Sequence, residues 1–178
     1  MTPPPTAPTT LIRPAQREDL QAILEIYNDA VLHTTASYDY HPRTLDHRIA
    51  WFEDHVAQNY PIFVACNAQH EVVGWSSLSR FHDRPGYRFT CENSIYIAPP
   101  WRGQGIGSQL LTPLIENAQS QGLHSILAVI DASNQASIKL HAKFGFTTVG
   151  MFKEVGFKFN RWLDVAYMQK LLPLPSPS

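Results

Sequence analysis

The sequence predicts a single α/β domain built on a central mixed sheet with helices on both of its faces. Apolar residues recur at gaps of three and four over residues 20–31 and 45–56, which is the period of helices with one buried face. Apolar runs at residues 62–65 and 72–78, separated by a polar turn, predict an antiparallel hairpin. Strands and helices then alternate towards the C-terminus, and this order is typical of an α/β sandwich.

The other elements can be placed from similar local patterns. Pro113 falls inside one of the expected helices, where a proline removes a backbone hydrogen bond and bends the helix. In chain order, we expect a strand at 11–14, a polar loop at 34–43, a strand at 91–97, a helix over 110–118, a strand at 125–130, a helix at 136–144, and strands at 146–149 and 165–168.

Length and composition exclude several classes of protein. The chain has 178 residues, which suits one domain at residues 11–172. Proline-rich tails at residues 1–10 and 173–178 are expected to be disordered. There are 14 basic and 15 acidic residues, so charge gives no reason to expect binding to nucleic acid or to a membrane surface. No apolar run reaches the roughly 20 residues of a membrane span, and we expect a cytoplasmic protein.

The two cysteines and eight histidines give no sign of a disulfide framework or a metal site. Cys66 and Cys91 are too few for a framework of disulfides and lack metal-ligand spacing, so buried free thiols are expected. The histidines show no zinc-binding pattern, and we expect no metal.

A glycine-rich turn between a strand and a helix is the most informative motif in the chain. Residues 101–108 read WRGQGIGS, after an apolar run at 94–97 and before an amphipathic helical pattern. Glycine permits positive φ and close approach of a ligand, and the first amides of a helix bind phosphate or pyrophosphate. The spacing fits neither a P-loop nor a dinucleotide fingerprint. A helix that merely begins with a glycine-rich turn is the alternative.

A second polar segment, at residues 131–137, also follows a buried strand and opens a helix. Asn134 in this segment can cap that helix. Together, Arg102-x-x-Gly105-x-Gly107 and this segment, with Gly145-Phe146 at the end of its helix, resemble the acyl-CoA site of the GCN5-related N-acetyltransferase (GNAT) superfamily.

Four further segments extend the resemblance from about residue 11 to residue 172. They are similar to the phosphinothricin N-acetyltransferase group, which includes methionine sulfoximine and methionine sulfone acetyltransferases, and they lie at residues 60–65, 92–97, 137–141 and 156–164. The resemblance implies a mostly antiparallel mixed sheet that is splayed at the acyl-CoA site. It also implies acetyl-CoA as co-substrate, a small amino-acid-like acceptor and a homodimer.

The resemblance assigns the donor site to the strand and the glycine turn. The backbone of Ile95, Tyr96 and Ile97 would hold the pantetheine arm, and a backbone amide there can stabilise the oxyanion of acyl transfer. The turn would bind the pyrophosphate, with Asn134 contacting the CoA arm. The expected members of the turn are Arg102, Gly103, Gln104, Gly105, Ile106, Gly107 and Ser108.

Two residues are candidates for proton transfer. Glu92 matches the glutamate of the family pattern and is the candidate general base, with an ordinary edge-strand glutamate as the alternative. His141 stands where many GNAT enzymes carry a tyrosine that acts as general acid to the thiolate. The phosphinothricin group often has histidine there. A packed, hydrogen-bonded histidine is an equally good interpretation of this position.

An acceptor that carries a carboxylate calls for a guanidinium group. Arg88 is the first candidate and Arg80 the second, with Tyr38 and Phe81 as walls of the pocket. Lys158 and Arg161 on a late hairpin are candidates to reach a partner subunit's site, and for Lys158 a solvated surface charge is the favoured interpretation.

The sequence therefore predicts an acetyl-CoA-dependent N-acetyltransferase for the α-amine of a small amino-acid analogue, such as phosphinothricin or methionine sulfoximine or sulfone. Two alternatives stay open. One is an acetyltransferase for protein N-termini or another small amine, and the other is a CoA-binding sensor without turnover.

Overall fold

The computed structural model describes residues 10–173. Residues 1–9 and 174–178, where disordered tails are expected, lie outside the described residues. Short 3-10 turns at Arg17–Asp19, Pro85–Tyr87 and Pro99–Trp101 join longer elements. The helices are α1 (Leu20–His33), α2 (Leu45–Ala57), α3 (Ile106–Ser120) and α4 (Gln135–Lys143). The strands are β1 (Leu11–Pro14), β2 (Ile62–Cys66), β3 (Val72–Arg80), β4 (Thr90–Ile97), β5 (Ser125–Asp131), β6 (Thr147–Lys158) and β7 (Arg161–Leu171).

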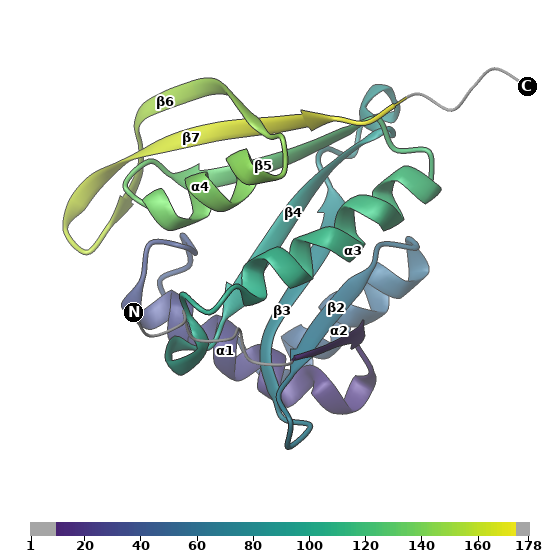
Figure 1. The fold of residues 1–178 in the computed structure, drawn as a ribbon. Coiled ribbons are helices and arrows are strands. Elements are labelled where there is room, and N and C mark those ends of the chain that lie inside the picture. The colour runs from purple at the N-terminus through teal and green to yellow at the C-terminus, as the bar shows by residue number, and fades with distance from the viewer. Residues whose placement is uncertain (1–9, 174–178) are drawn as a thin grey trace, which may run out of the picture.

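The strands form one seven-stranded sheet in the order β1-β2-β3-β4-β5-β7-β6 (Figure 1). All neighbouring strands are antiparallel except β4 and β5, which run parallel and are connected through α3. The sheet is therefore mixed and mostly antiparallel. The fold class expected from the sequence is confirmed.

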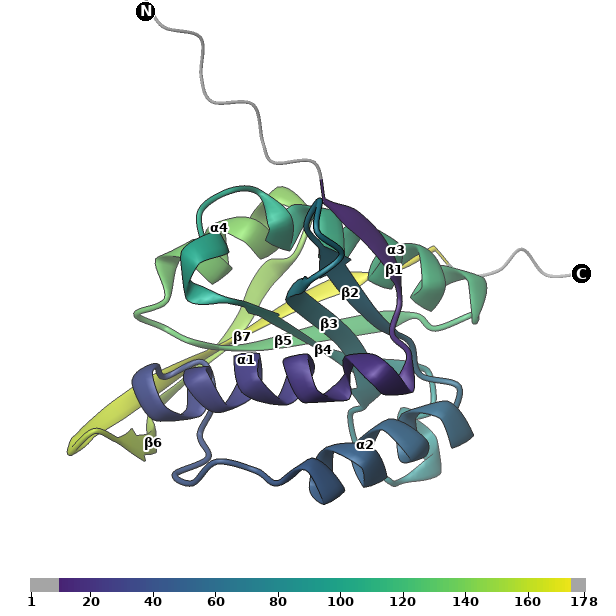
Figure 2. The ribbon, with the colours of Figure 1, turned by 90° about the horizontal axis from the view of Figure 1, so that it is seen from below.

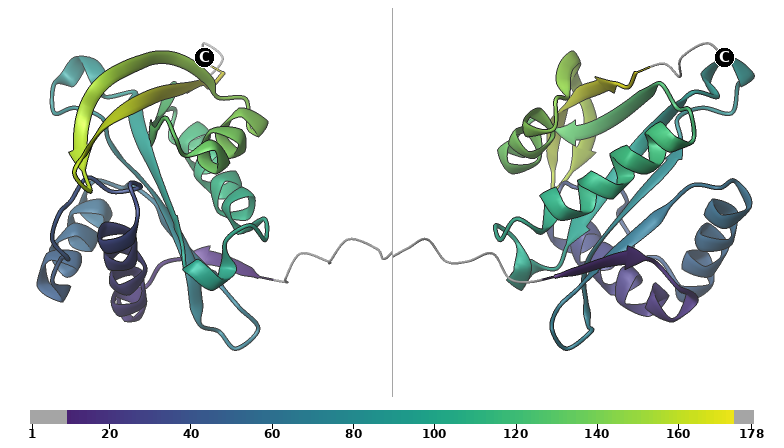
Figure 3. Two further views of the ribbon diagram at one scale, coloured as in Figure 1. Left: turned by 90° about the vertical axis from the view of Figure 1, so that its left-hand side faces the viewer. Right: turned by 45° about the vertical axis from the view of Figure 1, so that its right-hand side comes forward.

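The helices cover both faces of this sheet, with α1 and α2 on one face and α3 and α4 on the other (Figures 2 and 3). On the first face, Ile23 of α1 packs in a cluster with Trp75 of β3. On the second face, Leu111 and Leu114 of α3 pack against Ile126 of β5. Because the buried stripe of each helix meets the sheet, helix position follows directly from the apolar periodicity of the sequence.

The sheet is split between its two parallel strands. β4 and β5 pair only where Thr90–Glu92 meets Ser125–Leu127. Beyond Glu92 the two strands diverge (Figure 1), with β4 continuing along β3 and β5 continuing along β7. The split leaves the β5-facing edge of residues 93–97 without a strand partner, because β5 has turned away at that level.

The hairpin of β6 and β7 is much longer than the sequence indicated. Strands were expected only at 146–149 and 165–168, but the pair extends to Lys158 and Arg161. Most of β6 is exposed, so the extra length carries little of the buried apolar pattern that identifies a strand. Phe159 and Asn160 form the connecting turn with φ of 51° and 57°. Two residues with positive φ are typical of a tight type I′ hairpin turn.

Candidate active site

A cavity of about 800 Å³ lies at the split in the sheet. Its walls come from the diverging halves of β4 and β5, from the glycine-rich turn, from α4, and from residues 35–39 in the connection between α1 and α2. Segments that are far apart in the sequence therefore meet where the two central strands separate.

The glycine-rich turn has the backbone conformation that its sequence predicts. Gly103 and Gly105 adopt φ of 74° and 83°, and α3 begins at the next residue, Ile106. The amides of Ile106 and Gly107 are at the first two helical positions, where no carbonyl of the same helix can accept from them. The Ile106 side chain is buried in the core, so only its backbone is available to a ligand. An anion at this turn would meet free amides and the positive end of the helix dipole.

Gly107 has a separate structural reason to be glycine. A Cβ atom built at this position would lie 2.9 Å from Cδ2 of Leu140, which is in α4. The close approach of α3 and α4 narrows the cavity at the turn. Ser108, Gly103, Gly105 and Gly107 all line the cavity.

The two polar side chains of the turn behave differently from each other. Arg102 lines the cavity, and its guanidinium donates to Ile97 O at 3.0 Å and pairs with Asp29 at 3.0 Å. The pair partly neutralises the positive charge that Arg102 would bring to a phosphate. The Gln104 side chain donates to Pro100 O at 2.8 Å and is not part of the cavity wall. A contact from Gln104 to a ligand is therefore limited to its backbone.

Alternate residues of β4 point their backbone N–H and C=O groups away from β3 and towards the split. Ala98 N donates to Val73 O, so the residues paired by hydrogen bonds to β3 are the even-numbered ones. The N–H and C=O groups of Ile95 then point towards the split, whereas those of Tyr96 point to β3. Ile95 thus offers both backbone groups to a pantetheine arm, whereas Ile97 offers its N–H, because its C=O already accepts from Arg102. Tyr96 contributes its side chain to the cavity wall.

Side chains of β4 and β5 alternate between the two faces of the split. Ile126 packs on the α3 face, and Tyr96 packs with Tyr27 and Trp75 on the α1 face. By the two-residue period of strands, Glu92 shares the α1 face with Tyr96. A ligand on the glycine turn and a ligand beside Glu92 would therefore approach the split from opposite faces.

Glu92 lies where the parallel ladder ends, paired in register with Ser79 and Leu127. Glu92 lines the cavity, and its carboxylate forms no hydrogen bond or ion pair with another described residue. Burial raises the pKa of its carboxyl group. A carboxyl group with these properties can accept a proton from an amine near neutral pH.

His141 is buried on the other face, with only 4% of its surface exposed. Its Nδ1 lies 2.8 Å from Ser137 O, so this nitrogen carries a proton and donates to the carbonyl. Its Nε2 lies 2.9 Å from Nδ2 of Asn93, which donates to it. Burial lowers the pKa of His141. The neutral ring therefore has no proton on Nε2 to give, and the geometry makes it a partner of Asn93 rather than a ready acid.

Asn134 has both of the properties considered from its sequence position. Its side chain caps α4 by accepting from Ser137 N at 3.1 Å. It also lines the cavity, opposite the glycine-rich turn. Asn134 therefore caps α4 with its side chain and is also part of the cavity wall.

Of the four candidates for acceptor binding, one lines the cavity and three lie outside its wall. Tyr38 lines the cavity, and burial raises its pKa to about 12, with a further contribution from the negative charge of Asp131. Arg88 and Arg80 lie outside the cavity wall; the first contacts Phe89 and the second pairs with Asp83 at 3.1 Å.

Phe81 also lies outside the cavity wall, where it packs on His82 and Tyr87. The expectation that Arg88, Arg80 and Phe81 enclose the acceptor is thus not met in the described chain. They lie around the β3–β4 connection, at the opposite end of β4 from the glycine-rich turn.

Lys158 is not a surface charge, and it does not extend away from its own subunit. It is 3% exposed, and its Nζ donates to Thr34 O at 2.9 Å and to Ser37 O at 2.5 Å. Arg161 is exposed and lines a smaller recess beside the main cavity. No sequence pattern indicates this contact of Lys158, because its partners are backbone carbonyls more than 120 residues earlier in the chain.

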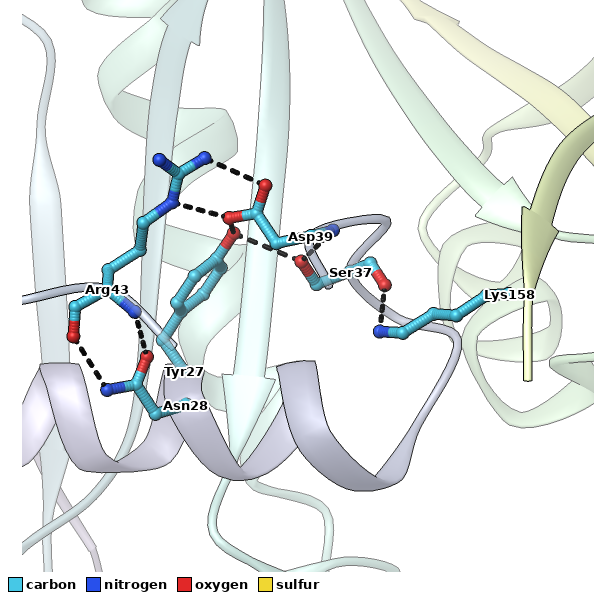
Figure 4. A network of polar contacts seen from close by, with 6 residues as sticks. All are labelled: Tyr27, Asn28, Ser37, Asp39, Arg43 and Lys158. Atoms are coloured by element: carbon cyan, nitrogen blue, oxygen red, sulfur yellow. Dashed lines mark hydrogen bonds and ion pairs between the residues drawn. The ribbon is translucent and has the colours of Figure 1, made fainter. Parts of the chain in front are cut away.

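Sequence reasoning also missed Asn93 and the hydrogen-bonded group around Tyr27. Tyr27 lines the cavity, and its hydroxyl donates to Asp39 at 2.7 Å (Figure 4). Strand alternation next to Glu92 could have drawn attention to Asn93, since neighbouring residues of a strand serve opposite faces.

Within residues 10–173, no three His, Cys, Asp or Glu side chains are grouped closely enough to hold a metal ion. Over the same residues, no helix is long and apolar enough to cross a bilayer. Cys66 and Cys91 are free and buried.

A split mixed sheet, a glycine-rich helix start at its opening and a half-buried carboxyl group on its other face are features of acyltransferases that use an acyl thioester of CoA. The chain belongs to the GNAT acetyltransferase family, because a family model described as an acetyltransferase (GNAT) domain matches residues 10–147. The fold and the assignment from sequence are both confirmed.

Relatives and solved structures agree with this membership. The chain is 48% identical to an L-methionine sulfoximine/L-methionine sulfone acetyltransferase of Pseudomonas aeruginosa, over 89% of this chain and 92% of that protein. A putative acetyltransferase of Salmonella typhimurium, solved with acetyl-CoA, superposes with a TM-score of 0.91 at 39% identity, over 94% of this chain and 96% of the other. A phosphinothricin acetyltransferase of Sinorhizobium meliloti, also in complex with acetyl-CoA, gives a TM-score of 0.90 at 38% identity, over 92% and 89% of the two chains.

Proposed function

We propose that this protein transfers the acetyl group of acetyl-CoA to the α-amine of a small amino-acid analogue, with methionine sulfone, methionine sulfoximine and phosphinothricin as the first substrates to test. The observation that carries the proposal is the position of Glu92. Its carboxyl group lies at the point where β4 and β5 separate, beside the unpaired strand edge that would hold the thioester. Relatives of this chain carry the names of enzymes for these acceptors.

The donor would extend from the glycine-rich turn, where its pyrophosphate binds, into the split between β4 and β5. Amides of residues 103–108 bind the pyrophosphate, and the backbone of Ile95 and Ile97 pairs with the pantetheine arm. In this arrangement the carbonyl of the thioester lies near the backbone N–H groups of β4 that point into the split. One of these groups can donate to the oxyanion that forms during attack.

Glu92 acts on the acceptor from the α1 face. An α-amine is largely protonated at neutral pH, since its pKa is about 7.7–8.0. Glu92 accepts a proton from the ammonium, directly or through one water, and frees the nitrogen lone pair to attack the carbonyl carbon. The C–N bond forms, the C–S bond breaks, and the CoA thiolate leaves with the electron pair and takes up a proton.

His141 supports this reaction through Asn93. The neutral imidazole accepts from the Asn93 side chain at 2.9 Å and fixes the rotamer of that residue at the edge of the split. Oδ1 of Asn93 is buried and has no hydrogen-bond partner among the described residues. An N–H group of a pantetheine arm lying along β4 is the donor that would satisfy this oxygen.

We also propose that the protein is a cytoplasmic homodimer with β6 at its interface. β6 is the edge strand of the sheet, and it carries a row of exposed apolar side chains. Exposed apolar edge strands in soluble proteins are usually covered by a partner. The exposed residues are Val149, Met151, Phe152, Val155 and Phe157, with Trp162 beside them on β7.

The experiment is a thiol-release assay with acetyl-CoA and a panel of amines. Methionine sulfone, methionine sulfoximine and phosphinothricin are compared with N-acetylmethionine sulfone, which has no free amine, and with a short peptide. The proposal expects turnover of at least one free amino-acid analogue and none of the blocked compound. Turnover of the peptide alone would assign the chain to protein N-termini, and CoA binding without turnover of any amine would make it a sensor.

A further inference from the structure

A buried lysine joins the tip of the β6–β7 hairpin to the wall of the cavity. Lys158 is the last residue of β6, and its Nζ donates to the carbonyl of Thr34 and to that of Ser37. Figure 4 shows the contact with Ser37. These carbonyls belong to the loop of residues 34–39 that follows α1, and residues 35–39 of this loop line the cavity on the face of Glu92. The lysine therefore holds one wall of the proposed acceptor site in place.

A buried ammonium group is costly, so its presence needs a physical reason. Burial lowers the pKa of Lys158, and the carboxylate of Asp39 offsets part of that effect. The ammonium also lies 5.1 Å from the ring centroid of Phe159, at cation–π distance. Its hydrogen bonds go to backbone carbonyls of the loop, and no other described lysine side chain donates to these carbonyls. The group thus compensates for carbonyls that the loop would otherwise bury unpaired.

The loop is fastened from its other side by a second set of hydrogen bonds. The Ser37 hydroxyl lies 3.0 Å from the Tyr27 hydroxyl and accepts from Asp39 N. Asp39 accepts from Tyr27 at 2.7 Å and forms a two-bond pair with Arg43 at 2.7 and 2.8 Å (Figure 4). Because Ser37 joins both sets, a shift of its carbonyl away from Lys158 would also disturb Tyr27 and Asp39 in the cavity wall.

The hairpin tip contacts the loop at two more places. The Tyr40 hydroxyl donates to Phe157 O at 2.5 Å. The ring of Tyr38 packs so closely on Gly156 that a Cβ there would lie 2.7 Å from Tyr38 Cε1. Residues 156–158 and residues 37–40 are thus matched in shape, and Tyr38 lies directly between the hairpin and the cavity.

The hairpin turn is itself a fixed support. Phe159 has φ of 51°, a conformation that is costly for a bulky residue with a Cβ. Lys158 and Arg161 are paired across this turn, so the direction of the lysine side chain is set by a two-residue connection. Strained backbone of this kind is typically retained at functional positions.

We propose that Lys158 is a positioning residue for the acceptor amine: by fastening residues 34–39 to the β6–β7 turn, it sets how tightly the enzyme binds its acceptor and leaves acetyl-CoA binding unchanged. The selectivity follows from the two faces of the split. Ser37 and Asp39 of the anchored loop contact Tyr27 on the face of Glu92, whereas the helix that follows the glycine-rich turn and α4 lie on the other face. The proposal rests on the proposed function for the identity of the acceptor.

The test compares Lys158→Met, Lys158→Arg and Lys153→Met. Methionine keeps the unbranched chain apart from its last atom and removes the charge and the donors, and arginine restores both in part. Lys153 is the matched control, because it is also on β6 but its ammonium is exposed and pairs with Asp164 at 2.7 Å. In thiol-release kinetics with methionine sulfone, Lys158→Met should raise KM for the amine about tenfold or more, a change of about 1.4 kcal/mol. KM for acetyl-CoA should change by less than about twofold, Lys158→Arg should recover part of the loss, and Lys153→Met should change neither constant.

Hydrogen exchange gives a readout that needs no substrate. Amides of residues 34–39 should exchange at least about tenfold faster in Lys158→Met, while those of α2 should keep their wild-type rates. If Lys158→Met does not fold, Tyr40→Phe removes the hydrogen bond to Phe157 O from an exposed position next to the same loop. KM for the amine should then rise more than KM for acetyl-CoA, by a smaller factor than in Lys158→Met.

Equal increases of both KM values, or unchanged exchange at residues 34–39, would overturn the proposal and leave Lys158 a residue of general stability. If the wild-type enzyme acetylates no amine, the proposed function fails. The exchange experiment then still decides whether Lys158 anchors the loop.

Discussion

Replacing Glu92 with glutamine is expected to abolish most activity and, at the same time, to stabilise the protein. Glutamine keeps the size of the side chain and cannot accept the proton of the acceptor amine. A general base contributes roughly 10²- to 10⁴-fold to a rate, so kcat at pH 7 should fall within that range. At pH 9–10, where the amine loses its proton unaided, the deficit should shrink by about tenfold or more.

The stability effect follows from the burial of the same group. Burial raises the pKa of Glu92, and no other described residue forms a hydrogen bond or ion pair with its carboxylate. The native state therefore binds this proton more tightly than the unfolded state does. The stabilisation from the protonated group is complete below the ordinary glutamate pKa of about 4.3 and is lost as pH rises through the higher native pKa. Each unit of elevation costs about 1.4 kcal/mol at neutral pH.

Glu92→Gln should remove that cost, since the neutral amide is cheaper to bury than a carboxylate. For a chain of this size, about 1 kcal/mol corresponds to a rise in Tm of roughly 2–4 °C. Thermal unfolding at pH 7 should show the increase, and at pH 4 the two proteins should unfold at similar temperatures. The control is Glu116→Gln on the exposed face of α3, which should change neither activity nor Tm. Unchanged kcat at neutral pH would show that Glu92 is not the base, and a Tm difference that is the same at pH 4 and pH 7 would show that its charge is not the source of the cost.

Three further predictions concern the donor face and a residue outside the cavity. Gly107→Ala places a methyl group 2.9 Å from Cδ2 of Leu140, so this side chain or the backbone of the turn must shift. Calorimetry should show CoA affinity falling about tenfold, and urea unfolding a loss of about 1–3 kcal/mol. Unchanged affinity together with unchanged stability would contradict this prediction. Burial lowers the pKa of His141, so the folded protein binds this proton more weakly than the unfolded chain does. Urea unfolding should therefore show stability falling as pH drops below about 6.5. His141→Gln should flatten this pH dependence, and an equal slope in both proteins would contradict the prediction. Arg88→Ala should change KM for methionine sulfone by less than about twofold in thiol-release kinetics, because Arg88 lies outside the cavity, and a selective tenfold rise would place it in the acceptor site.

The parts of the fold that sequence could predict are those with local signals. The glycine-rich turn is predictable from its own residues, because Gly103 and Gly105 allow the positive φ that they adopt and the amphipathic helix begins at the next residue. The buried stripes of α1 and α2 likewise place those helices on the sheet. The hairpin of β6 and β7 was underestimated because most of β6 is exposed, so it lacks the apolar pattern that marks a strand.

The parts of the site that sequence could not predict depend on distance in space. Arg88 was chosen because it lies four residues before Glu92. A strand advances about 3.3 Å per residue, so four residues amount to roughly 13 Å. For Lys158 the sequence favours a surface charge, because its partners at Thr34 and Ser37 are carbonyls that any residue type provides. His141 was ambiguous for a similar reason, since its hydrogen bond to Ser137 O decides which nitrogen carries the proton.

Titration calorimetry can show whether backbone amides of residues 103–108 hold the diphosphate of the donor. CoA is compared with pantetheine, which has the same thiol arm and no nucleotide or diphosphate. CoA should bind at least about a hundredfold more tightly to the wild-type protein, and Gly105→Ala, whose φ of 83° is unfavourable for alanine, should remove most of that difference. Equal affinities for CoA and pantetheine would contradict the account.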